Sequence, residues 1–214
     1  MGKLILLRHT ESEWNAKGIW SGITDVCLSE KGEKDCLTVG DKLKSLNIKI
    51  DVACYTDQKR TSQTLDGVCK VIGEDGLMKL CEPGFDERNY GEYTGMNKWK
   101  VKEEVGEDKF NQIRRGWNVL IPNGETLKDV YGRVVPAYQQ TILPLLREGK
   151  NVLVVAHGNS LRALIKYLES ISNQEVEKLE MLMNQTLVYE IDRQSGLKKS
   201  VQTIDTGVVI ESKF

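Results

Sequence analysis

The stretch VLVVAHGNSLRALIKYL (residues 152–168) decides the fold class of this 214-residue chain. Its first five residues are apolar, which predicts a strand buried on both faces, and the Gly-Asn-Ser sequence after His157 predicts a turn. A helix follows, and its predicted buried face consists of Leu161, Leu164, Ile165 and Leu168. A strand, a turn and a helix in this order are typical of an α/β protein with a mainly parallel sheet.

Similar apolar runs occur elsewhere in the chain, as KLILL (3–7), DVACYT (51–56) and LVYEI (187–191). Helical patterns follow Ser29 and cover residues 65–72, where Gly73 is the predicted stop signal. We therefore expect an α/β fold with a mainly parallel central sheet and helices on both faces. The tail after Gly196 offers only one weak strand pattern, GVVIE (207–211).

The segment at about 84–123 differs from the rest of the chain, because it is polar, rich in Trp and Lys, and has no strand-like run. We interpret it as an excursion from the sheet and not as a second domain. No repeat or linker divides the chain, and its length suits one compact unit. We therefore expect a single domain over residues 1–214.

Composition limits the partners of this protein. The 30 basic and 31 acidic residues leave a formal net charge of -1, so no global field attracts nucleic acid or an anionic membrane, and any anion must be bound locally. The five cysteines have no metal-ligand or CxxC spacing, which predicts reduced thiols. No secretion signal or membrane-span pattern occurs, so we expect a soluble, cytoplasmic protein.

The chain has only two histidines, His9 and His157, and each follows a strongly apolar strand. In open α/β sheets the carboxyl ends of the strands form the ligand crevice, where helix N-termini favour anions. Arg8 precedes His9, Arg60 follows the strand at 51–56, and Arg162 lies in the helix after His157. Converging guanidinium groups suit a dianionic phosphoryl group. These residues therefore predict a phosphate site.

Neighbouring positive charge disfavours an imidazolium ion, so we expect His9 to be neutral and nucleophilic near neutral pH. A neutral His9 could attack phosphorus and form a phosphohistidine, while His157 would donate to the phosphoryl oxygens. Metal binding by the two histidines is an alternative, but no HxH or HxxxH spacing or acidic cluster supports it. Each residue taken alone is more often structural, and only their joint placement favours a catalytic site.

Several motifs resemble the cofactor-dependent phosphoglycerate mutases of the histidine phosphatase superfamily. They are LRHTESEWN (7–15), WSGITDVCLSEKG (20–32), DERNYGEYTGMNK (86–98), RRGWNVLIPNGETLKDVYGRVVPAY (114–138) and VAHGNSLRALIKYLE (155–169). The resemblance extends from Lys3 to about Asp192. It implies interconversion of 3-phosphoglycerate and 2-phosphoglycerate, with 2,3-bisphosphoglycerate as the phosphoryl primer and no metal. The resemblance leaves the oligomeric state open between a homodimer and a homotetramer.

The resemblance also implies a role for particular residues. His9 would be the phosphorylated nucleophile, with Arg8, Arg60 and His157 around the phosphate. Glu87 would be the general acid and base. The implied substrate contacts are Asn15, Ser21, Gly22, Arg88, Tyr90, Lys98, Arg114, Arg115, Gly158 and Asn159. Among these, Lys98, Arg114 and Arg115 would form a second anion site within the excursion. Taken alone, such a charge cluster is more often a solvated helical face.

Some positions depart from the mutase pattern. Thr10 stands where mutases of this group usually have Gly and where phosphatase branches can have Thr. Asn89 replaces a more usual His or Asp, and Asp57 would place a carboxylate near the phosphate site. We therefore keep two alternatives to the mutase, a histidine-dependent phosphomonoesterase and a non-catalytic module that binds a phosphorylated ligand.

Overall fold

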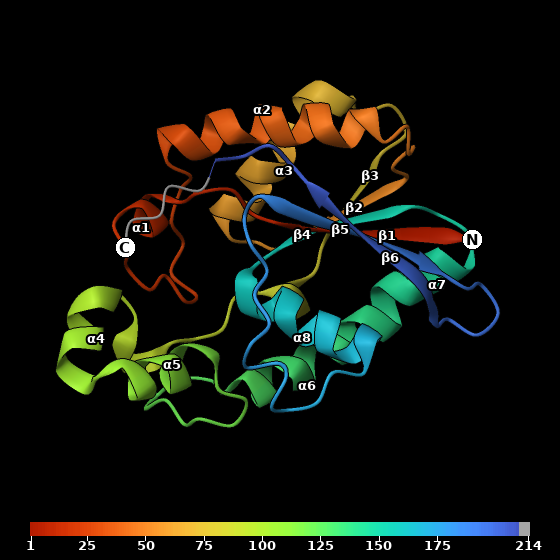
Figure 1. Cartoon of the computed structure of the whole chain (residues 1–214). Helices are drawn as coiled ribbons and strands as arrows, with labels where there is room; N and C mark the ends of the chain where they lie inside the picture. Colours follow the sequence, from red (N-terminus) through yellow and green to blue (C-terminus); the bar gives the residue numbers. More distant parts are fainter. Residues whose placement is uncertain (210–214) are drawn as a thin grey trace.

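A six-stranded sheet organises the protein, and the computed structural model describes residues 1–209 of it (Figure 1). The strand order is β3-β2-β4-β1-β5-β6. The strands are β1 (Gly2–Arg8), β2 (Val52–Tyr55), β3 (Met78–Cys81), β4 (Val152–Ala156), β5 (Gln185–Ile191) and β6 (Lys198–Asp205). The weak pattern at 207–211 was wrong as a strand for residues 207–209, and its last two residues lie outside the described part.

The centre of the sheet is parallel and one side is antiparallel. Strand β4 runs parallel to both β1 and β2, and β3 runs parallel to β2. Strand β5 is antiparallel to β1, and β6 is antiparallel to β5. The predicted mainly parallel sheet is therefore confirmed. In the β1–β4 pair Arg8 lies opposite Ala156, so His9 and His157 leave the sheet side by side.

Helices cover both faces of the sheet, as predicted (Figure 1). One face carries α2 (Glu30–Ser45) and α3 (Lys59–Ile72). The other face carries α6 (Leu127–Ala137), η3 (Tyr138–Ile142), α7 (Leu143–Arg147) and α8 (Gly158–Glu169). The predicted helix caps are present at the start of α2 and at the end of α3. The Ser29 side chain accepts a hydrogen bond from the Gly32 amide, and Gly73 ends α3 with a φ of 84°.

The hydrophobic core divides into two layers because successive strand residues point to opposite faces. Leu4, Leu6 and Val152 pack with α6 and α8, while Ile5 and Leu7 pack with α2 and α3. All five side chains are buried. This double burial explains why β1 and β4 are continuous apolar runs, and it fixes the strand ends that carry the histidines.

The excursion carries short helical elements to one side of the sheet (Figure 1). They are η1 (Pro83–Phe85), η2 (Gly91–Tyr93), α4 (Lys98–Val105) and α5 (Glu107–Arg115). Residues 84–123 contain no strand, as predicted. Trp20, which follows α1 (Glu13–Ala16), stacks on Tyr90 with ring centroids 5.4 Å apart and joins a separate small core with Phe110. This packing holds α4 and α5 over the carboxyl ends of β1 and β4.

Candidate active site

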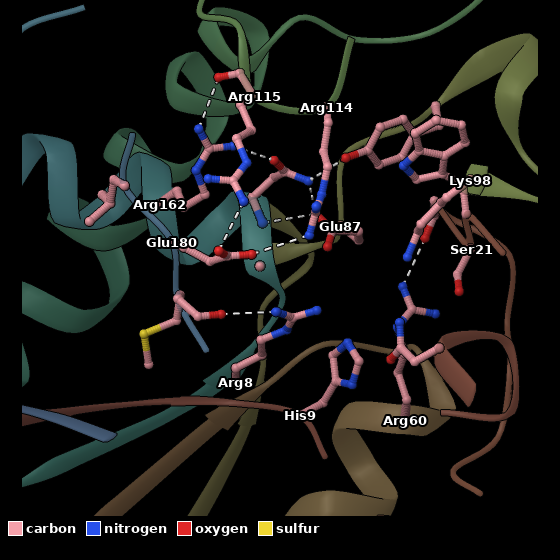
Figure 2. Close-up of a pocket in the computed structure, with 18 residues that line it drawn as sticks. Arg8, His9, Ser21, Arg60, Glu87, Lys98, Arg114, Arg115, Arg162 and Glu180 are labelled. Atoms are coloured by element: carbon pink, nitrogen blue, oxygen red, sulfur yellow. Dashed lines mark hydrogen bonds and ion pairs between the residues drawn. The ribbon is translucent and has the colours of Figure 1, made fainter. Parts of the chain in front are cut away.

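A pocket lies at the carboxyl ends of β1 and β4, where the sequence predicts it (Figure 2). The rings of His9 and His157 are buried there, with centroids 5.2 Å apart. Six cationic side chains line the pocket: Arg8, Arg60, Lys98, Arg114, Arg115 and Arg162. Among residues 1–209, the carboxylates that line it with them are Glu87 and Glu180. A protein of nearly zero net charge therefore concentrates positive charge at this one site.

Most of the predicted site residues line this pocket. They are Arg8, His9, Asn15, Ser21, Gly22, Arg60, Glu87, Tyr90, Lys98, Arg114, Arg115, Gly158 and Asn159. Two predicted residues, Arg88 and His157, do not belong to the lining. The structure thus brings together side chains that are as much as 151 positions apart in the sequence, from Arg8 to Asn159.

The His9 ring points into the pocket from the end of β1 (Figure 2). Its Nδ1 atom lies 2.7 Å from the carbonyl oxygen of Thr10. A carbonyl only accepts, so Nδ1 carries the proton. Burial lowers the pKa of His9 well below 6.5, and the charges of Arg60 and Arg8 lower it further. His9 is therefore neutral with a bare Nε2. The guanidinium groups contribute to this state as predicted, but burial is the larger cause.

Thr10 fits its position without strain. It is not among the residues with a positive φ, so the turn after His9 needs no glycine. The Thr10 side chain is fully buried, and its hydroxyl lies 3.2 Å from Cys36 Sγ and 3.3 Å from Thr64 Oγ1. The Thr10 amide also donates to Thr64 Oγ1 over 3.2 Å. These contacts hold the Thr10 carbonyl against His9.

His157 lies behind the pocket wall, with both ring nitrogens engaged. Its Nδ1 accepts a hydrogen bond of 3.1 Å from Arg60 Nε, and its Nε2 lies 3.0 Å from Thr56 Oγ1. Because Nδ1 is an acceptor, the proton of the neutral ring is on Nε2, which donates to Thr56. Burial, followed by the charge of Arg60, lowers the pKa of His157 well below 6.5. His157 thus has the opposite tautomer to His9 and positions Arg60.

Arg60 connects His157 to a loop at the pocket rim. Its Nη2 donates to the Gly22 carbonyl over 2.8 Å, and its Nη1 donates to the Thr24 carbonyl over 2.8 Å. Gly22 has a φ of 51°, a conformation that disfavours side chains. Ser21 and Gly22 therefore form a part of the lining that the Arg60 guanidinium holds in place.

Arg8 and the start of α8 face the same position. The Nε atom of Arg8 is buried, with no hydrogen-bond partner within the described chain, which indicates a donor available to a ligand. Gly158 and Asn159 lie in the first turn of α8, at the positive end of its helix dipole. An anion beside His9 would therefore meet guanidinium groups and a helix N-terminus together.

Glu87 lies on the far side of the pocket from His9 (Figure 2). Its Oε1 accepts hydrogen bonds from the Arg88 amide at 2.8 Å and from Asn159, through the backbone amide at 3.2 Å and Nδ2 at 3.1 Å. The same Asn159 Nδ2 also donates to the Tyr90 hydroxyl over 3.1 Å. These contacts orient the Glu87 carboxylate in a pocket lined mainly by cations, as a general base requires.

The excursion brings three cations to the outer part of the pocket. Lys98 is the first residue of α4, and Arg114 and Arg115 are the last two residues of α5. Burial, followed by the positive charges of Arg114 and Arg8, lowers the pKa of Lys98 to about 8. Arg114 and Arg115 each donate to the Glu180 carboxylate, at 3.2 and 2.9 Å. Lys98, Arg114 and Arg115 therefore lie together at the pocket, as the sequence predicts.

Arg88 needs a correction, because its guanidinium does not reach the pocket. The side chain is fully buried, and it donates to the carbonyl oxygens of Glu125 at 2.6 Å and Ile113 at 3.0 Å. A buried guanidinium needs such acceptors, and these two fasten the excursion to the start of α6. Asp57 is exposed and outside the lining, so it does not face the predicted phosphate site. Asn89 accepts from the Gly91 amide and stays outside it too.

Several residues of the pocket were not predicted from the sequence. Trp20 lines it beside Ser21, and Leu179, Glu180 and Met181 enter from the connection between α8 and β5 (residues 170–184). That connection has no apolar periodicity or motif that could have placed it. The Arg162 guanidinium, suspected from its place after His157, donates to Asn159 Oδ1 at 2.9 Å and to the Val176 carbonyl at 2.7 Å.

Residues 1–209 were also compared with the requirements of a metal site and of a membrane-spanning helix, and they meet neither. No group of three or more His, Cys, Asp or Glu side chains is placed to hold a metal ion within that range. Over the same residues, the structure contains no helix with the length and apolar character that crossing a bilayer requires.

Comparison with known proteins gives one family. The model of the histidine phosphatase superfamily (branch 1) matches residues 4–206. A Schizosaccharomyces pombe protein named phosphoglycerate mutase is 38% identical over 202 residues, which cover 94% of this chain and 95% of that protein. A Bradyrhizobium diazoefficiens protein named 2,3-bisphosphoglycerate-dependent phosphoglycerate mutase is 39% identical over 192 residues, covering 90% of this chain and 93% of the relative.

Solved structures share the fold at lower identity. A putative alpha-ribazole-5'-P phosphatase from Escherichia coli superposes with a TM-score of 0.79 at 20% identity, covering 98% of this chain and 99% of that one. A mycobacterial glucosyl-3-phosphoglycerate phosphatase gives a TM-score of 0.77 at 19% identity, over 95% and 97% of the two chains. These similarities establish the fold, while the sequence relatives and the structural neighbours carry different activities in their names.

Proposed function

Because this chain belongs to the histidine phosphatase superfamily, we propose that it interconverts 3-phosphoglycerate and 2-phosphoglycerate through a phosphohistidine at His9. The carrying observation is that a neutral His9 with a bare Nε2 shares one pocket with a second cluster of cations. The names of the sequence relatives support this activity. A phosphatase needs only the first feature, whereas a mutase must also hold the remainder of its substrate while the phosphoryl group moves.

In the first half of the reaction, phospho-His9 meets the free hydroxyl of a monophosphoglycerate. The hydroxyl oxygen attacks phosphorus, the bond between phosphorus and Nε2 breaks, and the hydroxyl proton passes to the Glu87 carboxylate. The product is 2,3-bisphosphoglycerate, and His9 is neutral again. Asn159 keeps Glu87 in place for this transfer through its contacts with Oε1.

In the second half, the bisphosphate turns so that its other phosphate faces His9. Nε2 attacks that phosphorus, the ester bond breaks, and Glu87 returns its proton to the leaving oxygen. The same steps run in both directions. An external molecule of 2,3-bisphosphoglycerate would phosphorylate the resting protein by this half-reaction, with Glu87 first taking the proton it donates from water, so we propose it as the primer.

Charge stabilisation comes from side chains and one helix end. Arg8, Arg60 and the N-terminus of α8 would bind the oxygens of the transferring group, where negative charge concentrates. For His157 to donate to that group, as the sequence analysis expects, Nδ1 would gain a proton and exchange its contact with Arg60 Nε for one with the phosphoryl oxygen. In its present contacts, His157 acts by positioning Arg60.

The outer cations would hold the part of the substrate that does not react. Lys98, Arg114 and Arg115 suit the carboxylate or the distal phosphate of a phosphoglycerate, since guanidinium groups bind such oxygens in pairs. Tyr90 and Asn15 line the same pocket. We expect the protein to act as a single domain in the cytoplasm. The cytoplasmic location stays a prediction, and so does assembly into a homodimer or a homotetramer.

A second candidate is a phosphomonoesterase, in which water replaces the hydroxyl acceptor. Thr10 favours it, because phosphatase branches can have Thr at this position, and the names of the structural neighbours are those of phosphatases. Both functions begin with phosphorylation of His9, so they differ in what accepts the group. A non-catalytic binding module is less compatible with the oriented Glu87 and the bare Nε2 of His9.

The test is an assay of 2-phosphoglycerate formed from 3-phosphoglycerate, with and without 2,3-bisphosphoglycerate, with orthophosphate measured in parallel. We expect 2-phosphoglycerate to form faster than orthophosphate and the bisphosphate to stimulate it. His9→Ala should abolish both products, while Lys34→Ala, on the exposed face of α2, should change neither. Release of orthophosphate without 2-phosphoglycerate would instead establish the phosphatase.

A further inference from the structure

The outer cations of the pocket already have an anionic partner from the same chain. Glu180 lies in the connection between α8 and β5, and its two carboxylate oxygens accept from Arg114 Nη2 at 3.2 Å and Arg115 Nη2 at 2.9 Å (Figure 2). The carboxylate of a bound glycerate would make the same contacts with the two guanidinium groups. Glu180 therefore occupies the position that the proposed function gives to the substrate.

Arginines of the pocket also hold the backbone around Glu180. Arg8 Nη1 donates to the Met181 carbonyl over 2.9 Å, and Arg162 Nη2 donates to the Val176 carbonyl over 2.7 Å. These two bonds fix the connection on either side of Glu180, so its carboxylate reaches the pocket from an anchored segment. The Glu180 side chain can then move away from the arginines while its backbone stays in place.

The ion pairs of Glu180 are of a kind that a ligand can replace. The Glu180 side chain is 36% exposed, and those of Arg114 and Arg115 are 34% and 28% exposed. Partly exposed pairs contribute little stability, because water and salt screen them. When a ligand carboxylate or phosphate displaces Glu180, it restores the ion pairs of both arginines. A neutral group that displaced Glu180 would leave both arginines without an anionic partner.

We propose that Glu180 is an internal competitor for the second anion subsite, which a ligand must displace with an anionic group of its own. The inference rests on the proposed function for the identity of that ligand, a phosphoglycerate. Glu180 lowers the affinity for the distal anion and returns to Arg114 and Arg115 when that anion leaves. For a bisphosphate intermediate that must turn around between two half-reactions, such an exchange partner keeps the distal end from being held too tightly.

The test compares two probes in binding experiments with the full chain. One is 3-phosphoglycerate, and the other is glycerol 3-phosphate, which has the same carbon skeleton with a neutral hydroxymethyl group in place of the carboxylate. We expect Glu180→Gln to tighten binding of 3-phosphoglycerate about fivefold, as loss of a weak competing ion pair predicts. Binding of glycerol 3-phosphate should stay the same, because that probe leaves Glu180 in place.

A matched control comes from the same connection. Glu177 accepts from the Trp117 amide at 3.2 Å and touches no pocket arginine in the described structure, so Glu177→Gln should change neither affinity. Glu180→Asp keeps the charge but shortens the side chain by one methylene group, and it should tighten binding of 3-phosphoglycerate to a smaller extent. This variant keeps the proposal testable if Glu180→Gln folds poorly.

The proposal is overturned if Glu180→Gln weakens or does not change the binding of 3-phosphoglycerate, or if it shifts both probes equally, as a purely structural role would. Failure of the proposed function has a different readout, because it shows as absence of 2-phosphoglycerate from the wild-type protein. A protein that forms no 2-phosphoglycerate but binds 3-phosphoglycerate more tightly after Glu180→Gln would support the competitor and reject the mutase.

Discussion

The Nδ1 atom of His9 lies 2.7 Å from the carbonyl oxygen of Thr10, and this contact decides which ring nitrogen can attack phosphorus. With the proton held on Nδ1, the lone pair of Nε2 is free. His157 has the opposite arrangement, since its Nδ1 accepts from Arg60 and its Nε2 faces Thr56. The two histidines of the chain thus differ in tautomer, and only His9 presents a free nitrogen.

This difference predicts a simple spectrum. In the ligand-free protein, nitrogen-detected NMR should show two neutral imidazoles, His9 protonated on Nδ1 and His157 protonated on Nε2. Because burial lowers the pKa of both rings well below 6.5, neither signal should titrate as pH falls through 6.5. A free histidine in the same buffer is the control and should titrate there. An imidazolium signal from His9 near neutral pH would remove its role as nucleophile.

Arg114 should matter for the unreacting end of the substrate and not for the phosphate beside His9. We expect Arg114→Ala to weaken binding of 3-phosphoglycerate about tenfold to hundredfold, because a hydrogen bond between charged groups is lost. Binding of orthophosphate should change little, since Arg8 and Arg60 remain. Titration calorimetry with both ligands checks this. Unchanged affinity for 3-phosphoglycerate would mean that the second anion subsite lies elsewhere.

Lys98 should make binding depend on pH. Its pKa of about 8 means that the free protein loses this charge as pH rises above 8. A bound anion favours the ammonium form, so binding takes up a proton above that pH, and the affinity for 3-phosphoglycerate should fall by up to about tenfold per pH unit. Below pH 8 Lys98 is already charged and adds no pH dependence.

The matched variant for this effect is Lys98→Arg, because a guanidinium keeps its charge throughout this range. Affinity measured by calorimetry should then lose its decline above pH 8 while staying similar below it. The same decline in both proteins would show that Lys98 does not titrate in contact with the ligand.

Sequence patterns predicted the elements that are buried on both faces. Strands β1, β2 and β4 are continuous apolar runs, because helices cover them above and below. The two edge strands were not predicted. Most residues of β3 and β6 are exposed, so neither has an apolar run, and pairing with β2 and β5 defines them instead. Strand pairing depends on contacts between distant segments of the chain, so the local sequence does not predict it.

The candidate site shows the same division. Arg8 ends β1, His9 follows it, and Asn159 lies in the first turn of α8. The sequence identifies both elements, so the meeting of these residues at one sheet edge could be predicted. Arg88 and Arg115 are both arginines within polar motifs, so the sequence does not distinguish their roles. In the structure the buried Arg88 donates to a backbone carbonyl, whereas Arg115 lines the pocket. Glu180 had no signal at all, because it enters from an irregular connection whose position depends on contacts with Arg8 and Arg162.

The most direct test of the central claim follows a labelled phosphoryl group. The protein is incubated with 2,3-bisphosphoglycerate labelled in its phosphates, and the phosphoenzyme is isolated and mixed with unlabelled 3-phosphoglycerate. We expect acid-labile label on His9, and we expect 3-phosphoglycerate to remove it into bisphosphoglycerate and 2-phosphoglycerate faster than water releases orthophosphate. No label on His9, or label that leaves only as orthophosphate at a rate that 3-phosphoglycerate does not change, would contradict the proposed mutase.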